Sequence, residues 1–135
     1  MAYEFKDLSM GVLAAPTTVW NSSSYQFRAV AASTVEGYFK ILGTTHGMVP
    51  VGIIQNKPRQ YESGEIWMPG CVSKVQAGAG GITVGKNVCF HGDGKAYSTG
   101  SLNKYDPIYG PCLLSASSGD IGTISFSLVG IKPTT

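Results

Sequence analysis

Hydrophobic and polar residues alternate in short runs along most of the chain, and turn-forming residues separate the runs. The alternation is clearest at residues 121–129, where Ile124 and Phe126 fall on one face and Ser125 and Ser127 on the other. A period of two is that of a half-buried β-strand. Similar signals predict further strands at residues 25–31, 38–42, 51–54, 65–68, 71–75, 88–91, 95–98 and 108–115. Many short strands joined by tight turns predict a mainly β fold, a small barrel or a sandwich.

The first twenty residues differ from the rest of the chain. Their apolar residues have no clear partner strand, and Pro16 favours extended backbone before it. We expect residues 1–20 to form an extended N-terminal arm and residues 21–135 a single β domain; the alternative is that the segment is the first strand of the domain's own sheet. Protein interfaces favour large apolar and aromatic anchors. Contact with a neighbouring chain is therefore expected from Tyr3, Phe5, Leu8, Val12 and Trp20.

The composition narrows the class of protein. The chain has 135 residues, enough for one domain. Only 13% of them are charged, about half the usual ~25%, and 18 are glycine, which disfavours long surface helices. The net charge is +2 without a basic or acidic run, so nucleic acid is not an expected partner. No apolar run approaches the ~20 residues of a membrane span, and the start lacks the basic and apolar stretches of a signal peptide, so we expect synthesis in a cytoplasm.

Few residues offer catalytic or metal-binding chemistry. Cys89 and His91 would share a face of one strand, with Asp93 close by, but zinc needs four ligands and no second pair is near in the sequence. Neither Cys89 nor Cys112 stands in a nucleophile elbow. We expect the three cysteines, with Cys71, to be buried reduced thiols. The prediction is a protein without enzymatic activity, metal or cofactor.

The middle of the chain carries a more specific pattern. Residues 50–58 spell P-V-G-I-I-Q-N-K-P; a Gly-Glu pair precedes the next predicted strand, and a further glycine precedes the C-V-S-K-V-Q-A-G stretch. This pattern resembles the head decoration proteins of tailed bacteriophages, also called capsid cement proteins, and the resemblance extends from about residue 27 to residue 129. The motif positions, for which it implies a structural role, are Gln55, Asn56, Pro58, Gly64, Glu65 and Gly70.

The resemblance implies both an architecture and a function. The architecture is a small β-barrel or β-tulip-like domain that assembles as a homotrimer. The function is binding without a reaction: the protein sits on the outer surface of an expanded phage head and holds neighbouring subunits of the major capsid protein together. A carbohydrate- or receptor-binding module of a virion, fibre-like or adhesin-like, is the alternative. A shallow pocket holding Trp67 or Tyr97 would favour that alternative.

Overall fold

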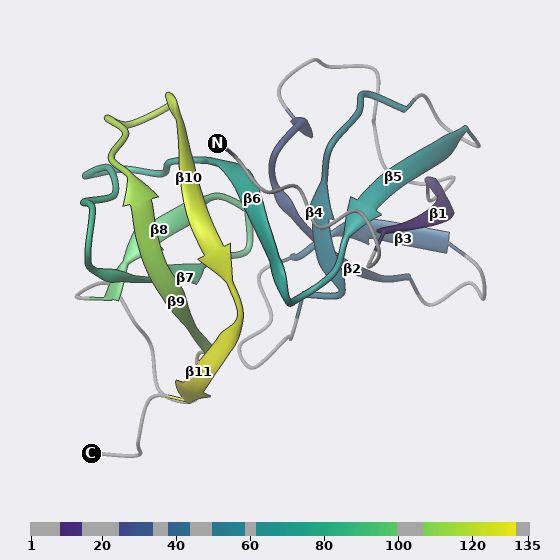
Figure 1. The fold of residues 1–135 in the computed structure, drawn as a ribbon. Helices are drawn as coiled ribbons and strands as arrows, with labels where there is room; N and C mark the ends of the chain where they lie inside the picture. The colour runs from purple at the N-terminus through teal and green to yellow at the C-terminus, as the bar shows by residue number, and fades with distance from the viewer. Residues whose placement is uncertain are drawn as a thin grey trace.

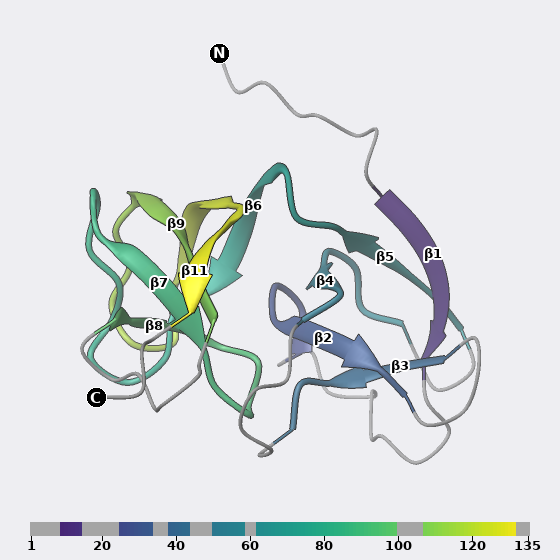
Figure 2. The ribbon, with the colours of Figure 1, turned by 90° about the horizontal axis from the view of Figure 1, so that it is seen from below.

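The protein is mainly β, as its sequence predicts. The computed structural model describes residues 9–14, 25–33, 38–43, 50–58, 62–99 and 107–131, without the side chains of residues 9–14 and 131. Within these ranges the chain forms eleven β-strands and no α-helix. The strands build two lobes that lie side by side (Figures 1 and 2): a closed barrel of β1 to β5 and a curled sheet of β6 to β11.

Five short strands make the barrel. They are β1 (Ser9–Ala14), β2 (Ala29–Ala32), β3 (Tyr38–Ile41), β4 (Gly52–Ile54) and β5 (Ser63–Trp67). Their order is β1-β3-β2-β4-β5, and β1 closes the ring because it pairs parallel with β3 and antiparallel with β5.

The position of β1 corrects the expectation of an N-terminal arm for Ser9–Ala14. These residues supply a strand of the domain's own barrel, which was the alternative, because the edges of β3 and β5 would otherwise be left without a partner. The other residues of the expected arm, 1–8 and 15–20, lie outside the described part of the chain.

The second lobe is a sheet that curls towards closure. Its strands are β6 (Cys71–Gln76), β7 (Asn87–Phe90), β8 (Ala96–Ser98), β9 (Pro107–Leu114), β10 (Ile121–Phe126) and β11 (Leu128–Ile131). The order is β6-β10-β9-β7-β8, and β11 continues the line of β10 along the other half of β9. A bridge between Ala77 and Ala96 brings the end of β6 back to β8. The predicted hairpin between β7 and β8 is confirmed.

Two predicted strands differ from the observed ones. The run at residues 121–129 is two strands, because the chain turns at Ser127, whose N–H donates to the carbonyl of Ser125 (3.0 Å). The run at residues 25–31 becomes a strand only at Ala29, because Phe27 has a φ of 62°, outside the β region. Backbone strain, rather than the hydrophobic pattern, sets that boundary.

Two groups of buried side chains form the hydrophobic core of the protein. Successive residues of a strand point to opposite faces, so in β2 and β4 Val30 and Ile54 face the barrel interior while Ala29 and Ile53 face the second lobe. Both strands are therefore buried on two sides, and one apolar core runs from the barrel into the sheet. In the sheet this core contains a cluster of aromatic rings with centroids 5.0–5.9 Å apart: Phe90, Tyr109 and Phe126.

Candidate functional site

The Gln-Asn pair of the sequence motif connects β4 to β5. The Asn56 side chain donates from Nδ2 to the carbonyl of Ser63 (3.2 Å) and accepts at Oδ1 from the N–H of Glu65 (2.9 Å). The N–H of Gln55 donates to the carbonyl of Glu65 (2.8 Å). An Asn side chain in this position replaces backbone partners that a turn would otherwise supply. These two motif residues thus brace the connection between the strands.

The remaining motif positions also have internal roles. Pro58 is buried. A Cβ on Gly64 would lie 2.5 Å from the ring of Phe39, so only glycine lets that ring fill the barrel. Gly70 has a φ of 110° where the chain crosses from barrel to sheet, and its N–H donates to the carbonyl of Phe126 (2.6 Å). The motif in this protein shapes the fold and the crossing between its lobes.

Polar contacts between the lobes centre on Arg28. Its Nε donates to Oε1 of Gln76 (2.8 Å) and its Nη1 to the carbonyl of Asp93 (3.3 Å), while the guanidinium lies 5.2 Å from the ring centroid of Tyr25. The strained backbone of Phe27 turns its carbonyl to accept from the N–H of Gln76 (2.8 Å). A bulky residue keeps a left-handed backbone conformation only where surrounding interactions hold it there. Here the hydrogen bond from Gln76 in the other lobe does so.

Two further connections reinforce this seam. The turn between β7 and β8 reaches into the barrel: the carbonyl of Gly94 accepts from the N–H of Ala29 (2.7 Å), and that of Gly92 from the N–H of Gly43 (2.8 Å). Gln55 spans the seam elsewhere, because its Nε2 donates to Oγ of Ser73 on β6 (2.9 Å). Together with the shared core, these bonds join barrel and sheet into one body.

Tyr97 does not offer its ring to a ligand. The ring of His91 stacks on it with centroids 3.9 Å apart and planes 15° from parallel. A Cβ on Gly78 would collide with atoms of the same ring, so that glycine must cover the opposite face. The hydroxyl donates to Oδ2 of Asp93 (2.6 Å); burial, together with this bond, raises the pKa of Tyr97 to about 12.

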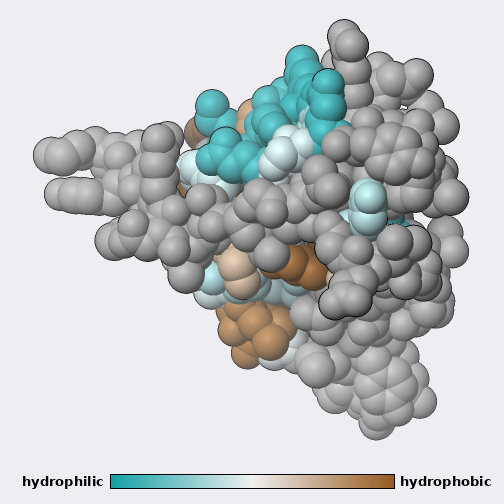
Figure 3. All heavy atoms as spheres, turned by 90° about the vertical axis from the view of Figure 1, so that its right-hand side faces the viewer, coloured by the Kyte–Doolittle hydropathy of each residue, from teal (hydrophilic) through white to brown (hydrophobic). Residues whose placement is uncertain are grey.

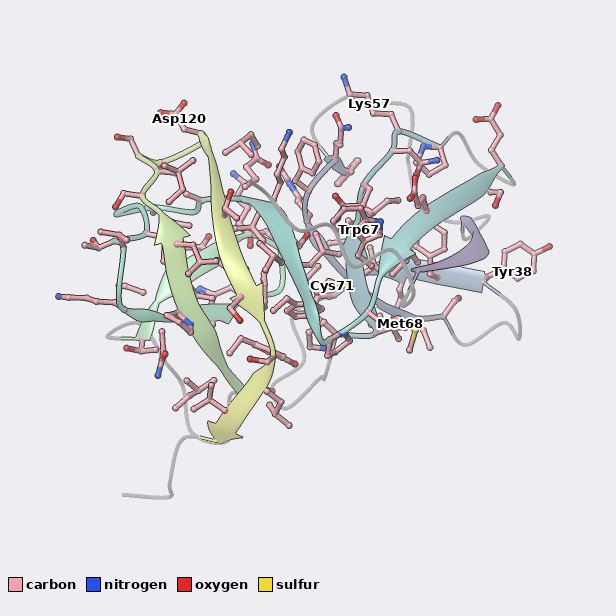
Figure 4. All side chains as sticks on the ribbon, viewed as in Figure 1. Tyr38, Lys57, Trp67, Met68, Cys71 and Asp120 are labelled. Carbon is pink, nitrogen blue, oxygen red and sulfur yellow. The ribbon has the colours of Figure 1, made fainter. Side chains whose placement is uncertain are left out.

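The second aromatic residue of the expected pocket also has a polar partner. Trp67 is half-buried at the end of β5, and its Nε1 donates to Oε1 of Glu65 (3.1 Å). Figure 4 shows it beside Met68, where the chain leaves the barrel and continues to Cys71 in the sheet. His91 and Gly78 cover the two faces of the Tyr97 ring, so a sugar ring could not stack on that residue.

The cysteine thiols that could have offered reactive groups are buried. Cys89 is fully buried, with its Sγ 3.9 Å from Nε2 of His91 and 3.7 Å from the carbonyls of Tyr97 and Ser98. The structure therefore brings Cys89 and His91 together, but in the interior. Burial raises the pKa of the Cys112 thiol, which donates to the carbonyl of Leu114 (3.1 Å).

The described residues contain neither a candidate metal site nor a membrane-spanning helix. No group of three or more His, Cys, Asp or Glu side chains there could hold a metal ion. No helix within the same ranges is long and apolar enough to cross a membrane. The absence of catalysis stays a prediction.

The exposed apolar surface lies in the second lobe. Among the described side chains, the exposed large apolar ones are 40–58% exposed. They belong to β6, β9, β10, β11 or the loop after β6. We call this set the apolar strip: Val72, Val84, Leu113, Leu114, Ile121, Leu128 and Val129.

Two β-bulges produce most of the apolar strip. Thr123 pairs with Leu114 and the next residue, Ile124, pairs with Cys112, so Leu113 is an extra residue in β9. A second register shift makes Val129 extra between Leu128 and Gly130 in β11. Bulges re-aim side chains and are structural features in their own right. Here each leaves two consecutive apolar side chains in solvent, where strict alternation would bury one of them.

The rest of the visible surface is more polar. On the described part of the face in Figure 3, hydrophilic side chains gather towards the top and hydrophobic ones lower down. Lys57, in the connection after β4, and Asp120, in the turn before β10, project from the upper side of the molecule in Figure 4. Among the described residues, the exposed large apolar side chains thus lie in the second lobe, whereas exposed charged groups lie on both lobes, Lys74 of β6 among them.

The contact residues expected from the sequence do not overlap with the apolar strip. Val12 lies in β1, where only the backbone is described. Tyr3, Phe5, Leu8 and Trp20 lie outside the described residues, so their role stays a prediction. The sequence does indicate the strip, through consecutive apolar pairs such as L-L and L-V at the ends of predicted strands. An analysis based on alternation alone does not detect such pairs.

Comparison with known proteins relates the fold to one from a virus. No family model and no curated protein matches the chain. Among solved structures, the head fiber gp8.5 N base of bacteriophage phi29 superposes with a TM-score of 0.61 at 22% sequence identity, covering 90% of this chain and 97% of that one. At this identity the match shows a common fold, and it shows it over nearly the whole of both chains.

Proposed function

We propose that the protein is a structural component of a phage virion that associates with the head. The observation that carries the proposal is the whole-chain likeness to a head fiber base, which includes both lobes rather than one barrel. The motif at residues 55–70, which resembles that of head decoration proteins, supports the same placement. The fold likeness and the motif resemblance are thus consistent with the same kind of particle.

In its specific form, the proposal is a decoration protein on the outer surface of the expanded head. It would bind the major capsid protein and hold neighbouring subunits together, with copies acting as a homotrimer. The physical mechanism is multivalency: each copy buries a modest area, and linked copies bind with a raised effective concentration. A body whose two lobes share one core can transmit load between subunits better than two lobes on a flexible linker.

Binding to heads tests this proposal. Purified protein is mixed with expanded heads of its phage from which the protein is missing, and with unexpanded shells as the matched control. We expect cosedimentation with the expanded heads, a rise in their melting temperature, and weaker binding to the unexpanded shells. Absence of binding to the expanded heads would overturn the proposal.

A fibre-like receptor-binding module is the second candidate, favoured by the word fiber in the name of the phi29 protein. The covered ring of Tyr97 argues against an aromatic sugar site at that residue. Adsorption separates the two: a receptor-binding module delays phage adsorption when added to host cells, whereas a decoration protein leaves adsorption unchanged and binds heads.

A further inference from the structure

One end of the apolar strip forms a compact patch on the second lobe. Thr123 pairs directly with Leu114, so their side chains share one face of the sheet, and Ile121 is the diagonal neighbour of Leu114 on that face, about 7–8 Å away. Leu113 is the extra residue of the bulge beside them. The N–H of Val84 donates to the hydroxyl of the serine directly after β9 (2.8 Å), which brings its loop to the same place. We call these four exposed residues the end patch: Val84, Leu113, Leu114 and Ile121.

Backbone hydrogen bonds hold the loop that completes the end patch. The N–H of Gly85 donates to the carbonyl of Cys112 in β9 (2.8 Å). Ile82 and Ala116 exchange two backbone bonds, of 2.9 and 3.1 Å, on the other side of Val84. A surface that is already ordered loses little conformational freedom when it binds. The end patch is therefore built in advance for contact with a partner.

Two opposite charges border the end patch. Lys86 is exposed in the same loop, and its carbonyl accepts from the N–H of Cys112 in β9 (2.8 Å). Asp120 is exposed directly before β10 and projects at the upper end of the sheet in Figure 4. Lys74 of β6 has its Nζ 5.8 Å from the ring centroid of Phe27 and so turns away from the end patch. Charges across an interface are arranged to be complementary, so a fitting partner carries an acidic group opposite Lys86 and a basic group opposite Asp120.

The size of the end patch indicates what kind of partner covers it. Its residues are 41–58% exposed, which amounts to roughly 350 Å² of side chain, within the range of the largest and often functional patches of monomers. Each partner of a standard complex contributes about 800 Å², more than twice as much. A contact of this size is weak alone and becomes strong when several linked copies bind a repeated surface together. Neighbouring subunits of a capsid offer such a surface, whereas a single free partner does not.

We propose that the end patch is the face with which this protein binds the major capsid protein. The inference rests on the proposed function and adds the contact surface to it. Leu114 and Ile121 cover an apolar area of the capsid subunit, and Lys86 and Asp120 face opposite charges at its rim. β11, which begins beyond the far end of β10, stays outside the contact.

Head binding by matched variants tests this assignment. Leu114→Lys places a charge within the end patch, and Leu128→Lys is the control, because it makes the same change in β11 at a leucine of nearly equal exposure (58% for Leu114 and 55% for Leu128). Each full-length protein is titrated against expanded heads that lack it and cosedimented with them. We expect wild type and Leu128→Lys to bind equally, and Leu114→Lys to bind at least about tenfold more weakly. Far-UV circular dichroism and melting verify that each variant is folded.

Charge reversal tests the rim of the end patch. Lys86→Glu and Asp120→Lys should each weaken head binding by about two- to fivefold, and the effect should shrink as salt is added, because salt screens exposed charges. Lys57→Glu is the matched control at an exposed lysine after β4, and it should bind like wild type. Reversals at Lys86 and Asp120 that bind like wild type would overturn the proposed charge match.

Four results decide between the proposals. A wild-type chain that binds no expanded heads overturns the proposed function, and this inference with it. Binding that Leu114→Lys leaves unchanged keeps the proposed function and overturns the end patch as its contact. An equal loss of binding in Leu128→Lys also overturns it, because the contact then extends to β11. Sedimentation velocity of the free proteins gives the fourth: loss of association between copies in Leu114→Lys, together with loss of head binding, assigns the end patch to the contact between copies and overturns the inference.

Discussion

The hydroxyl of Tyr109 gives the sharpest test of the core. The side chain is 1% exposed within the aromatic cluster, and its Oη has no hydrogen-bond partner among the described residues. A buried polar group without a partner costs about 1–3 kcal/mol. Removing it by Tyr109→Phe leaves the packed ring in place, because the ring contacts with Phe90 and Phe126 do not involve the oxygen. We expect the free energy of unfolding to rise by about 1–2 kcal/mol.

The same substitution at Tyr97 is the matched control. Its hydroxyl donates to the carboxylate of Asp93 (2.6 Å) at a half-buried position. Tyr97→Phe removes that bond and should lower the stability by about 1 kcal/mol, so one chemical change has opposite signs at two sites. Urea unfolding followed by circular dichroism measures both. Destabilisation by Tyr109→Phe of the same size as by Tyr97→Phe would refute the reasoning, because it would mean that the Tyr109 hydroxyl is well paired.

Three other outcomes follow from the structure. Stability should fall as pH rises from 10 towards 12, because burial raises the pKa of Tyr109 from 10 to about 12 and the unfolded chain therefore loses this proton first. The folded state gives up about 2–3 kcal/mol from this group. Absorbance at 295 nm should show late titration of Tyr109 and Tyr97, and Tyr109→Phe should remove the part due to Tyr109. Gly94→Ala should lower the free energy of unfolding by about 2 kcal/mol or more, because φ is +76° and a Cβ would lie 2.6 Å from the carbonyl oxygen of Ala29. Gly80→Ala is the control: its φ is +84° but the space around it is open, so it should cost about 1 kcal/mol in urea unfolding. Equal costs would contradict the close approach at Gly94. The three buried cysteine thiols should react with a maleimide only after unfolding, and rapid native labelling would show that the interior opens.

Much of the fold follows from local pattern. Alternation and turn chemistry locate most strands, and Gly92-Asp93-Gly94 marks the β7–β8 hairpin because glycine supplies the positive φ that the turn needs. The pattern fails where a long-range contact decides. Phe27 reads as a strand residue, yet its carbonyl must turn to reach Gln76 in the other lobe, 49 residues later in the sequence. Alternation of apolar and polar residues along the chain cannot predict such a long-range contact.

The candidate site was harder to predict than the fold. Sequence reasoning placed contact residues where apolar groups lacked a partner strand, but Ser9–Ala14 find two partners, β3 and β5, far along the chain. It also counted Leu113 and Leu114 together within one kinked strand. Both adjacent leucines face solvent because of a bulge, and a bulge is set by the register of the neighbouring strand. Tertiary pairing, which the local pattern does not contain, created the exposed strip.

The central claim is that this two-lobed protein belongs on a phage head. Electron cryomicroscopy of virions from the phage that encodes it, compared with virions lacking the gene, tests the claim most directly. We expect density on the outer surface of the head that fits barrel and sheet together and is absent from the deletion particles. Identical heads in the two preparations, or a difference confined to the tail, would contradict it.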